Sequence, residues 1–274
     1  MQDALFAEEE LPVAPPPPPK PRPRMSIAQH IRQFGYKHSP WQVFSDWLEM
    51  ASCAISNRCD LGQYEEREAR YMEIVKRYDK DEMSRMCEML AELTLQIGDG
   101  LDDYLGKTFH ELELHNKYKG QFFTPFIICE MMGRMSVCDI PRSKVEEKGY
   151  ITVCEPCVGA GAMLLGFAKA AAEAGISIDR ELHFTGIDID LKCVHMAYLQ
   201  LSLAGIPAAL YHGNSLAMGL TDEKAMSVWY TPQHILGGWS MRLKRDQPEE
   251  PVKPKPLAFP ETGTSLLFDL EEIA

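Results

Sequence analysis

The stretch ITVCEPCVGAGAM, residues 151–163, joins an apolar run to a loop of small residues. The β-branched and apolar residues at its start predict a strand over Tyr150–Cys154. Gly159 and Gly161 then allow a tight turn and a close approach of the backbone to a ligand, because neither has a Cβ. A run rich in Ala and Leu follows and predicts a helix from Ala162 to about Ala174. This order of strand, loop and helix is typical of an α/β fold.

The residues after this stretch continue the alternation of strand and helix. Strands are predicted at His183–Ile187, Ala208–His212 and Ser227–Tyr230, with a helix over Leu191–Leu203 between the first two. A helix from Phe126 to Ser136 is predicted before the first strand. Such alternation predicts a parallel sheet with helices on its faces.

Residues 40–105 have a helical pattern instead. Ser39 and Pro40 are a good helix start, the first as N-cap and the second in the first turn. A second helix is predicted at Tyr64–Tyr78 and a third at Asp81–Leu105. The third carries a Met-rich apolar stripe at three-to-four spacing, which is typical of a core, with a binding surface as the alternative.

Prolines concentrate at the two ends of the chain. Of the 19 prolines, eight lie in residues 1–24 and five in residues 248–260. Such segments favour extended, solvated chain, with docking to a partner as the alternative. We therefore expect a disordered Pro-rich tail over residues 1–38, a helical subdomain over 39–118, an α/β domain over 119–240 and a flexible Pro-rich tail over 241–274.

Composition sets limits on location and partners. The chain has 274 residues, 45% hydrophobic and 25% charged, with no run of 18 apolar residues and an acidic start, so we expect no membrane span and no signal peptide. Eight scattered cysteines do not form a disulfide framework, which favours the reducing cytoplasm. The net charge of -12 argues against coating nucleic acid by general electrostatics. An enzyme acting on DNA with this charge would need a local basic patch or a basic partner.

Cys154 and Cys157 form a C-x-x-C pair, which suggests zinc or redox chemistry. A structural zinc site usually needs four ligands, and the sequence has no second such pair. We therefore expect no metal site, with Cys154 as a small buried hydrophobic residue and Cys157 partly exposed.

Polar residues follow the predicted strands at the edge where ligands bind in open parallel sheets. Asp188 ends the second strand, where its carboxylate would bind two ribose hydroxyls or cap the next helix, and both interpretations stay open. Asn214 follows the third strand and brings an amide to the same edge. Leu164 stands where the dinucleotide fingerprint requires glycine, which disfavours NAD and FAD.

Four segments carry a family resemblance: GQFFTP (120–125), CEPCVGAGAML (154–164), GIDID (186–190) and HGNSL (212–216). In this order they resemble the adenine-N6 DNA methyltransferase family, in particular the modification subunits of type I restriction systems. The resemblance covers about Gly120 to Leu216. It implies a class I, Rossmann-like methyltransferase sheet, incomplete on its far side, that uses S-adenosylmethionine to methylate adenine N6 in DNA.

The resemblance also implies roles for particular residues. The methionine end of the cofactor would lie along Gln121, Phe122, Thr124 and Pro125, and its amino group near Glu155. Gly159 and Gly161 would make room for it, Asp188 would bind the ribose, and Asn214, where the family commonly has Asp, would face the adenine.

The catalytic turn departs from the family pattern. The family has Asn/Asp-Pro-Pro-Tyr/Phe after the fourth strand, which holds the N6 amino group of a flipped adenine. This chain has Thr231-Pro232-Gln233-His234 there, so the resemblance implies that Thr231 and Pro232 form the turn and that His234 stacks on the base. About 40 residues follow, too few for the family's remaining strands and its target-recognition region.

Three functional hypotheses follow. The first is an adenine-specific DNA methyltransferase that works with a specificity subunit or a second methyltransferase subunit. The second is a catalytically inactive cofactor-binding subunit or a regulator of a DNA-modification system. The third is a methyltransferase that acts on protein or RNA.

Overall fold

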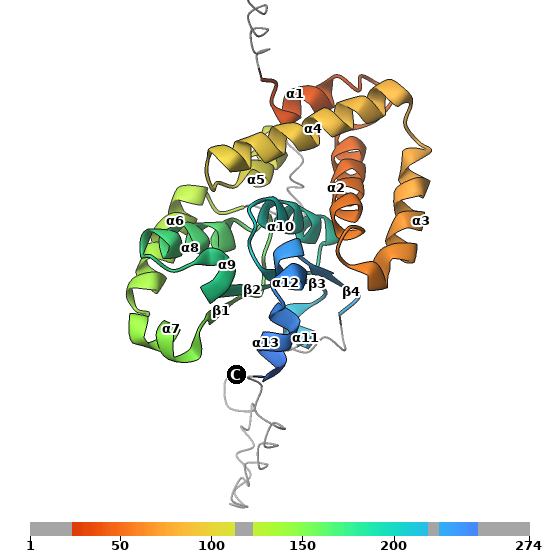
Figure 1. Ribbon diagram of the computed structural model, residues 1–274. Helices are drawn as coiled ribbons and strands as arrows, with labels where there is room; N and C mark the ends of the chain where they lie inside the picture. The colour runs from red at the N-terminus through yellow and green to blue at the C-terminus, as the bar shows by residue number, and fades with distance from the viewer. Residues whose placement is uncertain (1–23, 113–122, 219–224, 246–274) are drawn as a thin grey trace, which may run out of the picture. The chain divides into compact units, whose positions relative to one another are not determined.

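The computed structural model describes residues 24–112, 123–218 and 225–245, which form helices around one sheet (Figure 1). The chain divides into two units, Met1–Trp239 and Ser240–Ala274. The first unit contains the sheet, and the described part of the second is the remainder of helix α13 (Trp239–Arg245). No helix of the described residues combines the length and apolarity needed to cross a bilayer.

The sheet contains β1 (Ile151–Glu155), β2 (Leu182–Asp188), β3 (Ala208–His212) and β4 (Ser227–Tyr230), in the spatial order β1-β2-β3-β4. The four predicted strands are confirmed, with ends that differ by one residue in β1 and β2. β1, β2 and β3 are parallel, but β4 is antiparallel to β3. The fold is therefore α/β with a mixed sheet.

The prediction of a parallel sheet is thus wrong for β4. A parallel neighbour needs a crossover, usually a helix, that returns the chain to the opposite edge. The described part of the β3–β4 connection holds only the four-residue helix α11 (Ser215–Met218). β4 therefore starts at the edge where β3 ends, with Ser227 paired to His212 and Tyr230 to Ala209.

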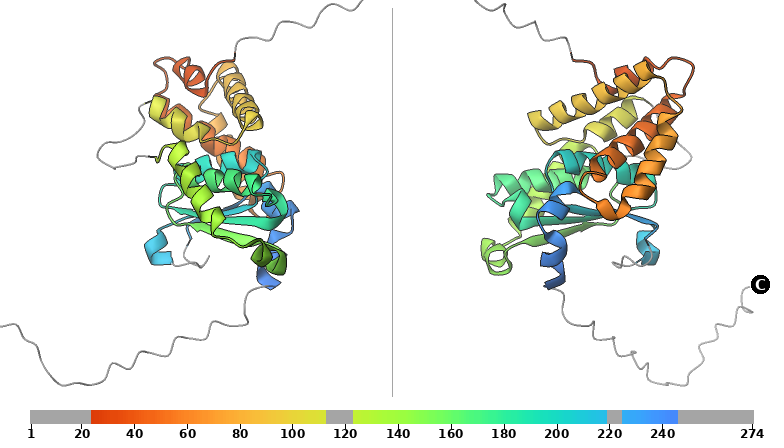
Figure 2. Two further views of the ribbon diagram at one scale, coloured as in Figure 1. Left: turned by 90° about the vertical axis from the view of Figure 1, so that its left-hand side faces the viewer. Right: turned by 45° about the vertical axis from the view of Figure 1, so that its right-hand side comes forward.

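Two crossover helices, α8 (Ala162–Glu173) and α10 (Leu191–Leu203), lie over the same face of the sheet (Figures 1 and 2). Helix α6 (Phe126–Cys138) lies beside α8, and α7 (Arg142–Lys148) and the short α9 (Ile178–Glu181) precede β1 and β2. The core under these helices includes Leu164, Phe184, Val194, Tyr198, Leu210 and Trp229.

The N-terminal helices are α1 (Ile27–Arg32), α2 (Pro40–Ser56), α3 (Tyr64–Val75), α4 (Lys80–Asp99) and α5 (Tyr104–Glu111), with a 3₁₀ turn at Leu61–Gln63. They share a core with α10, because Met196 and Leu199 lie in the same apolar cluster as Phe44, Trp47 and Phe109. The helical part and the sheet therefore support each other.

Two predicted boundaries in this part are wrong. The tail predicted over residues 1–38 contains α1, which Ser26 caps and which buries Ile27 and Ile31 in the helical core. The single helix predicted to reach Leu105 ends at Asp99, and Asp103 caps a new helix by accepting a hydrogen bond from the backbone N–H of Gly106 at 2.8 Å. The Ser39 cap at the start of α2 is confirmed, since its side chain accepts from the Gln42 backbone N–H.

Helices α6 and α8 approach closely at two glycines. A Cβ added to Gly133 would lie 2.7 Å from the carbonyl oxygen of Gly166, and one added to Gly166 would lie 2.7 Å from the backbone of Cys129. Contacts this short are not found for real side chains, so the crossing requires glycine in both helices. This fixes which face of α6 turns toward α8.

We expect Gly133→Ala to lower the free energy of unfolding by about 1–3 kcal/mol, because the two helices must move apart. The matched control is Gly98→Ala on α4, where an added Cβ meets nothing within 4 Å. That variant is expected to be neutral or slightly stabilising, since alanine has the higher helix propensity. Urea unfolding followed by circular dichroism measures both, and equal stabilities would contradict the close-approach argument.

Candidate functional site

The carboxyl ends of β1, β2 and β3 lie along one edge of the sheet. This edge is the one formed by the ends of the strands, not by the side of an outer strand. Glu155 ends β1, Asp188 ends β2, and Asn214 follows β3. The backbone N–H of Gly213 donates to the carbonyl oxygen of Asp188 at 2.8 Å, which holds the chain after β3 against the end of β2. The structure thus brings these three predicted side chains to the same edge.

The loop after β1 folds back over the end of β2. The backbone N–H of Val158 donates to the carbonyl oxygen of Ile187 at 2.8 Å, and that of Gly159 donates to Oδ2 of Asp188 at 2.9 Å. Gly159 and Gly161 have φ values of 54° and 93°, in the left-handed region that favours glycine. The two glycines are therefore needed for the shape of the loop itself.

Asp188 accepts backbone hydrogen bonds at both carboxylate oxygens. Oδ2 accepts from Gly159, and Oδ1 accepts from the N–H of Asp190 at 2.9 Å. The helix cap is a different residue, since Asp190 accepts from the Lys192 N–H at the start of α10. A carboxylate oxygen can accept more than one hydrogen bond, so Asp188 can also accept from a ligand. Burial raises the pKa of this half-buried carboxyl above its ordinary value.

Glu155 and Asn214 flank Asp188 and are tied to their own loops. Oε1 of Glu155 accepts from the N–H of Cys157 at 3.1 Å. Oδ1 of the exposed Asn214 accepts from the N–H of Leu216 at 3.1 Å, which leaves its NH₂ group as a donor. The edge therefore presents two carboxylates and one amide.

The segment before α6 reaches the loop through a residue that the sequence reasoning did not select. The aromatic ring of Phe123 lies 3.1 Å from the position that a Cβ on Gly159 would take, and it packs on Phe109 with ring centroids 5.1 Å apart. The predicted Thr124 and Pro125 are exposed beside it, at the start of α6. The predicted Gln121 and Phe122 lie outside the described residues. The aromatic pair at residues 122–123 is the sequence feature that could have identified Phe123 as a residue beside the loop.

Thr231, Pro232 and His234, which the resemblance assigned to the catalytic turn, lie at the edge of the sheet opposite to Asp188. The reason is the antiparallel direction of β4, whose end faces the start of β3. The buried Thr231 hydroxyl donates to the carbonyl oxygen of Ile206 and accepts from the N–H of Ala208, both at 2.8 Å.

Pro232 and His234 also have structural contacts there. Pro232 begins helix α12 (Pro232–Leu236), and Nδ1 of the buried His234 lies 2.8 Å from Nε2 of His183. Burial lowers the pKa of His234 to about 4. These contacts close the edge that holds the amino ends of β2 and β3.

Gln200 on α10 connects the loop to the helical part of the chain. Its fully buried side chain donates from Nε2 to the carbonyl oxygen of Ala160 at 2.7 Å and to Oδ1 of Asp103 at 3.0 Å. Its Oε1 accepts from the N–H of Leu105 at 3.1 Å. Burial raises the pKa of the Asp103 carboxyl. One amide therefore fixes both the glycine loop and the start of α5.

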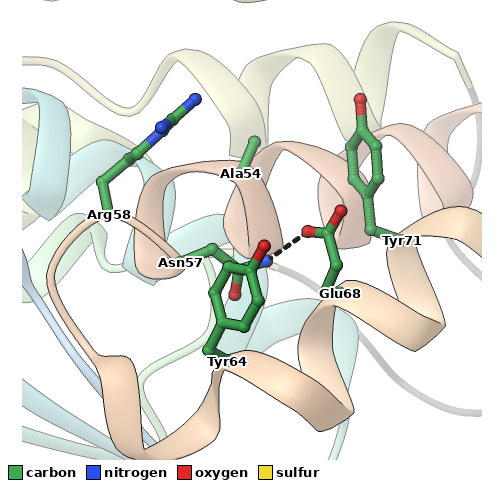
Figure 3. A pocket seen from close by; sticks show the side chains of 6 residues that line it. All are labelled: Ala54, Asn57, Arg58, Tyr64, Glu68 and Tyr71. Atoms are coloured by element: carbon green, nitrogen blue, oxygen red, sulfur yellow. Dashed lines mark hydrogen bonds between the residues drawn. The ribbon is translucent and has the colours of Figure 1, made fainter.

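A separate cavity of about 230 Å³ lies between α2 and α3 (Figure 3). Its lining consists of Ala54, Asn57, Arg58, Tyr64, Glu68 and Tyr71. Asn57 donates from Nδ2 to Oε2 of Glu68 at 2.8 Å. None of the predicted site residues lines it, and we assign it no role. Within residues 24–112, 123–218 and 225–245, no group of three or more His, Cys, Asp or Glu side chains is placed to hold a metal ion.

We expect Gln200→Leu to lower the free energy of unfolding by about 2–4 kcal/mol, because the buried Asp103 carboxylate loses one of its hydrogen bonds and the Ala160 carbonyl and Leu105 N–H lose their bonds to the amide. Hydrogen exchange at the amides of residues 158–161 should become faster, since the loop loses its bond to α10. The control is Gln63→Leu at an exposed position, where both quantities should stay unchanged. Unaltered exchange in the loop would show that Gln200 does not hold it.

Comparison with known protein families matches residues 103–255 to the N-6 DNA Methylase family, which is more than half of the 274 residues. No curated protein matches the chain, and no solved structure does. The matched range starts at Asp103, the partner of Gln200, and includes the glycine loop, Asp188 and Asn214. On this match, the chain belongs to the N-6 DNA methylase family, a family of DNA methyltransferases.

Proposed function

We propose that this protein binds S-adenosylmethionine at the Asp188 edge and takes part in methyl transfer to adenine N6 in DNA. The observation that carries the proposal is the glycine loop folded onto Asp188, with the N–H of Gly159 donating to its carboxylate at 2.9 Å. This arrangement places a half-buried carboxylate beside backbone that lacks a Cβ.

The residues at this edge fit the chemistry of the cofactor. The two carboxylate oxygens of Asp188 can accept further hydrogen bonds, which suits the two hydroxyls of a ribose. Glu155 offers a carboxylate for the amino group of the methionine part, and Asn214 offers an amide for the adenine edge. Gly159 leaves room beside Phe123. When bound, the cofactor supplies a sulfonium methyl group as the electrophile.

The protein's own contribution at this edge is binding and orientation. Asp188 is held by two backbone N–H groups, so its oxygens are fixed before a ligand arrives. The loop that carries Gly159 is held by Gln200 through Ala160. Methyl transfer depends on such fixed geometry, because the acceptor nitrogen must meet the methyl group in line.

The target adenine needs acceptors for its N6 amino group and a stacking surface. Thr231 and His234 are buried at the other edge, so we do not assign them these roles. We propose instead that a specificity subunit or a second methyltransferase subunit supplies them. The burial of Thr231 and His234 also favours one alternative function, that of a cofactor-binding subunit with no catalytic activity of its own.

Titration calorimetry with S-adenosylmethionine tests the shared premise. We expect the wild type to bind and Asp188→Asn to bind at least tenfold more weakly, which is about 1.4 kcal/mol. The control is Asp179→Asn, since Asp179 is exposed on α9 and bonded only to nearby residues on its own turn. Equal binding by the wild type and Asp188→Asn would contradict the assignment.

The pH dependence of this affinity provides an internal check. The ionised carboxylate accepts both ribose hydroxyls, so binding is complete above the pKa of Asp188 and is lost as the pH falls through it. Because burial raises that pKa, the loss should begin at a higher pH than an ordinary aspartate would give. Asp188→Asn should remove this part of the pH profile.

Transfer of a labelled methyl group to unmethylated DNA separates the two candidate functions. If the chain is the enzyme and a partner completes it, label should appear in N6-methyladenine when the partner is present and should be lost in Asp188→Asn. Cofactor binding without label under that condition would favour the inactive subunit. Label in RNA or protein instead of DNA would contradict the proposed substrate.

A further inference from the structure

β1 lies at one end of the described strand order β1-β2-β3-β4. Among the described residues, β2 is the only strand that pairs with it. Its outer edge therefore presents the N–H and C=O groups of alternate residues. Thr152 and Cys154 are also exposed on one face. The prediction that Cys154 is buried is wrong for this reason. Strands of parallel sheets are normally covered on both faces.

Helix α6 carries an apolar surface that no described residue covers. Five large side chains on it are 39% to 69% exposed: Ile127, Ile128, Met131, Met132 and Met135. They recur at three- and four-residue spacing and form one stripe along the helix. The other side of α6 buries Cys129, Gly133 and Val137. A solvent-facing helix surface is normally polar, and a contiguous apolar patch marks an interaction site.

The charged residues beside this stripe are paired within the chain. Glu130 accepts from Arg134 at 2.8 Å and from Lys169 at 2.9 Å, and Arg134 also lies 2.9 Å from Glu173. The stripe is therefore neutral and has no free charge of its own along this flank. A molecule that covers it must offer an apolar surface.

Helix α6, which carries the stripe, and β1 lie at the same end of the described sheet. In the left view of Figure 2, α6 and the β1 side of the sheet both face the viewer, and Figure 1 places α6 and β1 at the same end of the strand order. A partner that binds at this end of the sheet can contact both elements. We call this surface the β1–α6 face.

The topology places this face next to the proposed site. The strand order runs from β1 to β3 in one direction, with both crossover helices on one face. In doubly wound sheets the first strand is an inner one, and the ligand binds where the strand order reverses beside it. In this protein, the described strands lie on only one side of β1, the side of β2. Glu155 ends β1, the strand whose other side is left open by the described residues.

We propose that the β1–α6 face binds a different, basic protein chain that adds a strand along β1 and packs an apolar surface on the α6 stripe. The inference rests on the proposed function for its choice of partner. A chain with a net charge of -12 repels DNA, and a second copy would add the same charge again. A basic partner supplies both the missing strand and the positive surface that DNA needs.

The first experiment locates the partner. A photo-crosslinking amino acid replaces Met131 in the full chain, produced in its native cells, and the control carries it at Leu95, an equally exposed apolar position on α4. We expect one basic protein to be linked from position 131 and not from 95. Linkage to a second copy, linkage from both positions, or no linkage overturns the proposal.

The second experiment uses the captured protein after purification. We expect a complex by analytical ultracentrifugation, weakened at least hundredfold by the combined change Ile127→Glu, Met131→Glu and Met135→Glu. The control changes three exposed apolar residues elsewhere, Leu61, Met72 and Leu95, to Glu. It should bind as the wild type does. Equal weakening in both variants, or none in either, contradicts the assigned face.

The third experiment tests whether the partner covers β1. Cys154 should react with maleimide in the free chain and be protected in the complex, while the exposed Cys87 on α4 reacts in both. An unprotected Cys154 shows that the partner does not cover this face of β1 and contradicts the proposal. Failure of the two proposals differs in outcome. If the complex forms but no methyl transfer occurs, the proposed interface is supported and the proposed function is contradicted. If the triple Glu variant of α6 methylates DNA fully, the proposed function is supported and the proposed interface is contradicted.

Discussion

The arrangement of the site depends on the buried amide of Gln200. Its three hydrogen bonds, at 2.7, 3.0 and 3.1 Å, join α10 to the glycine loop and to the start of α5. A buried amide with unmet bonds costs about 1–3 kcal/mol for each group, so the side chain has one favourable arrangement. Because Ala160 is held by it, Gly159 stays within reach of Asp188. The helical part of the chain therefore helps to shape a site to which its own residues contribute little.

The direction of β4 makes the two edges of the sheet chemically different. At one edge the carboxylates of Glu155 and Asp188 face a loop without Cβ atoms at its turns. At the other edge the Thr231 hydroxyl makes two backbone bonds at 2.8 Å, and the His183–His234 pair is buried. A buried histidine with a lowered pKa stays neutral and suits a packed interior. These differences favour the edge that holds Asp188 for the proposed cofactor site.

Local pattern was enough to predict the strands, the crossover helices and the gathering of Glu155, Asp188 and Asn214 at one edge. These features depend on short-range periodicity and on the shared direction of parallel strands. The direction of β4 depends on a long-range pairing, which periodicity does not encode. Gln200 was missed because a single buried amide in an apolar helix has no repeating signal. Cys154 was expected to be buried because an inner and an edge strand of a parallel sheet have the same composition.

The exposed stripe on α6 is held in place by the rest of the fold. Gly133 and Gly166 lock α6 against α8, and the Glu130 pairs with Arg134 and Lys169 fix its flank. The stripe therefore keeps its direction without a partner, which lowers the ordering cost of binding. Burying one such side chain fully contributes about 1.5–3 kcal/mol, so covering the five partly exposed ones provides a favourable term that offsets part of the cost of association. An edge strand left open beside them is a hazard for aggregation unless something covers it. A fixed apolar helix face and an open strand at the same end of the sheet are together better explained by a partner chain than by exposure to water.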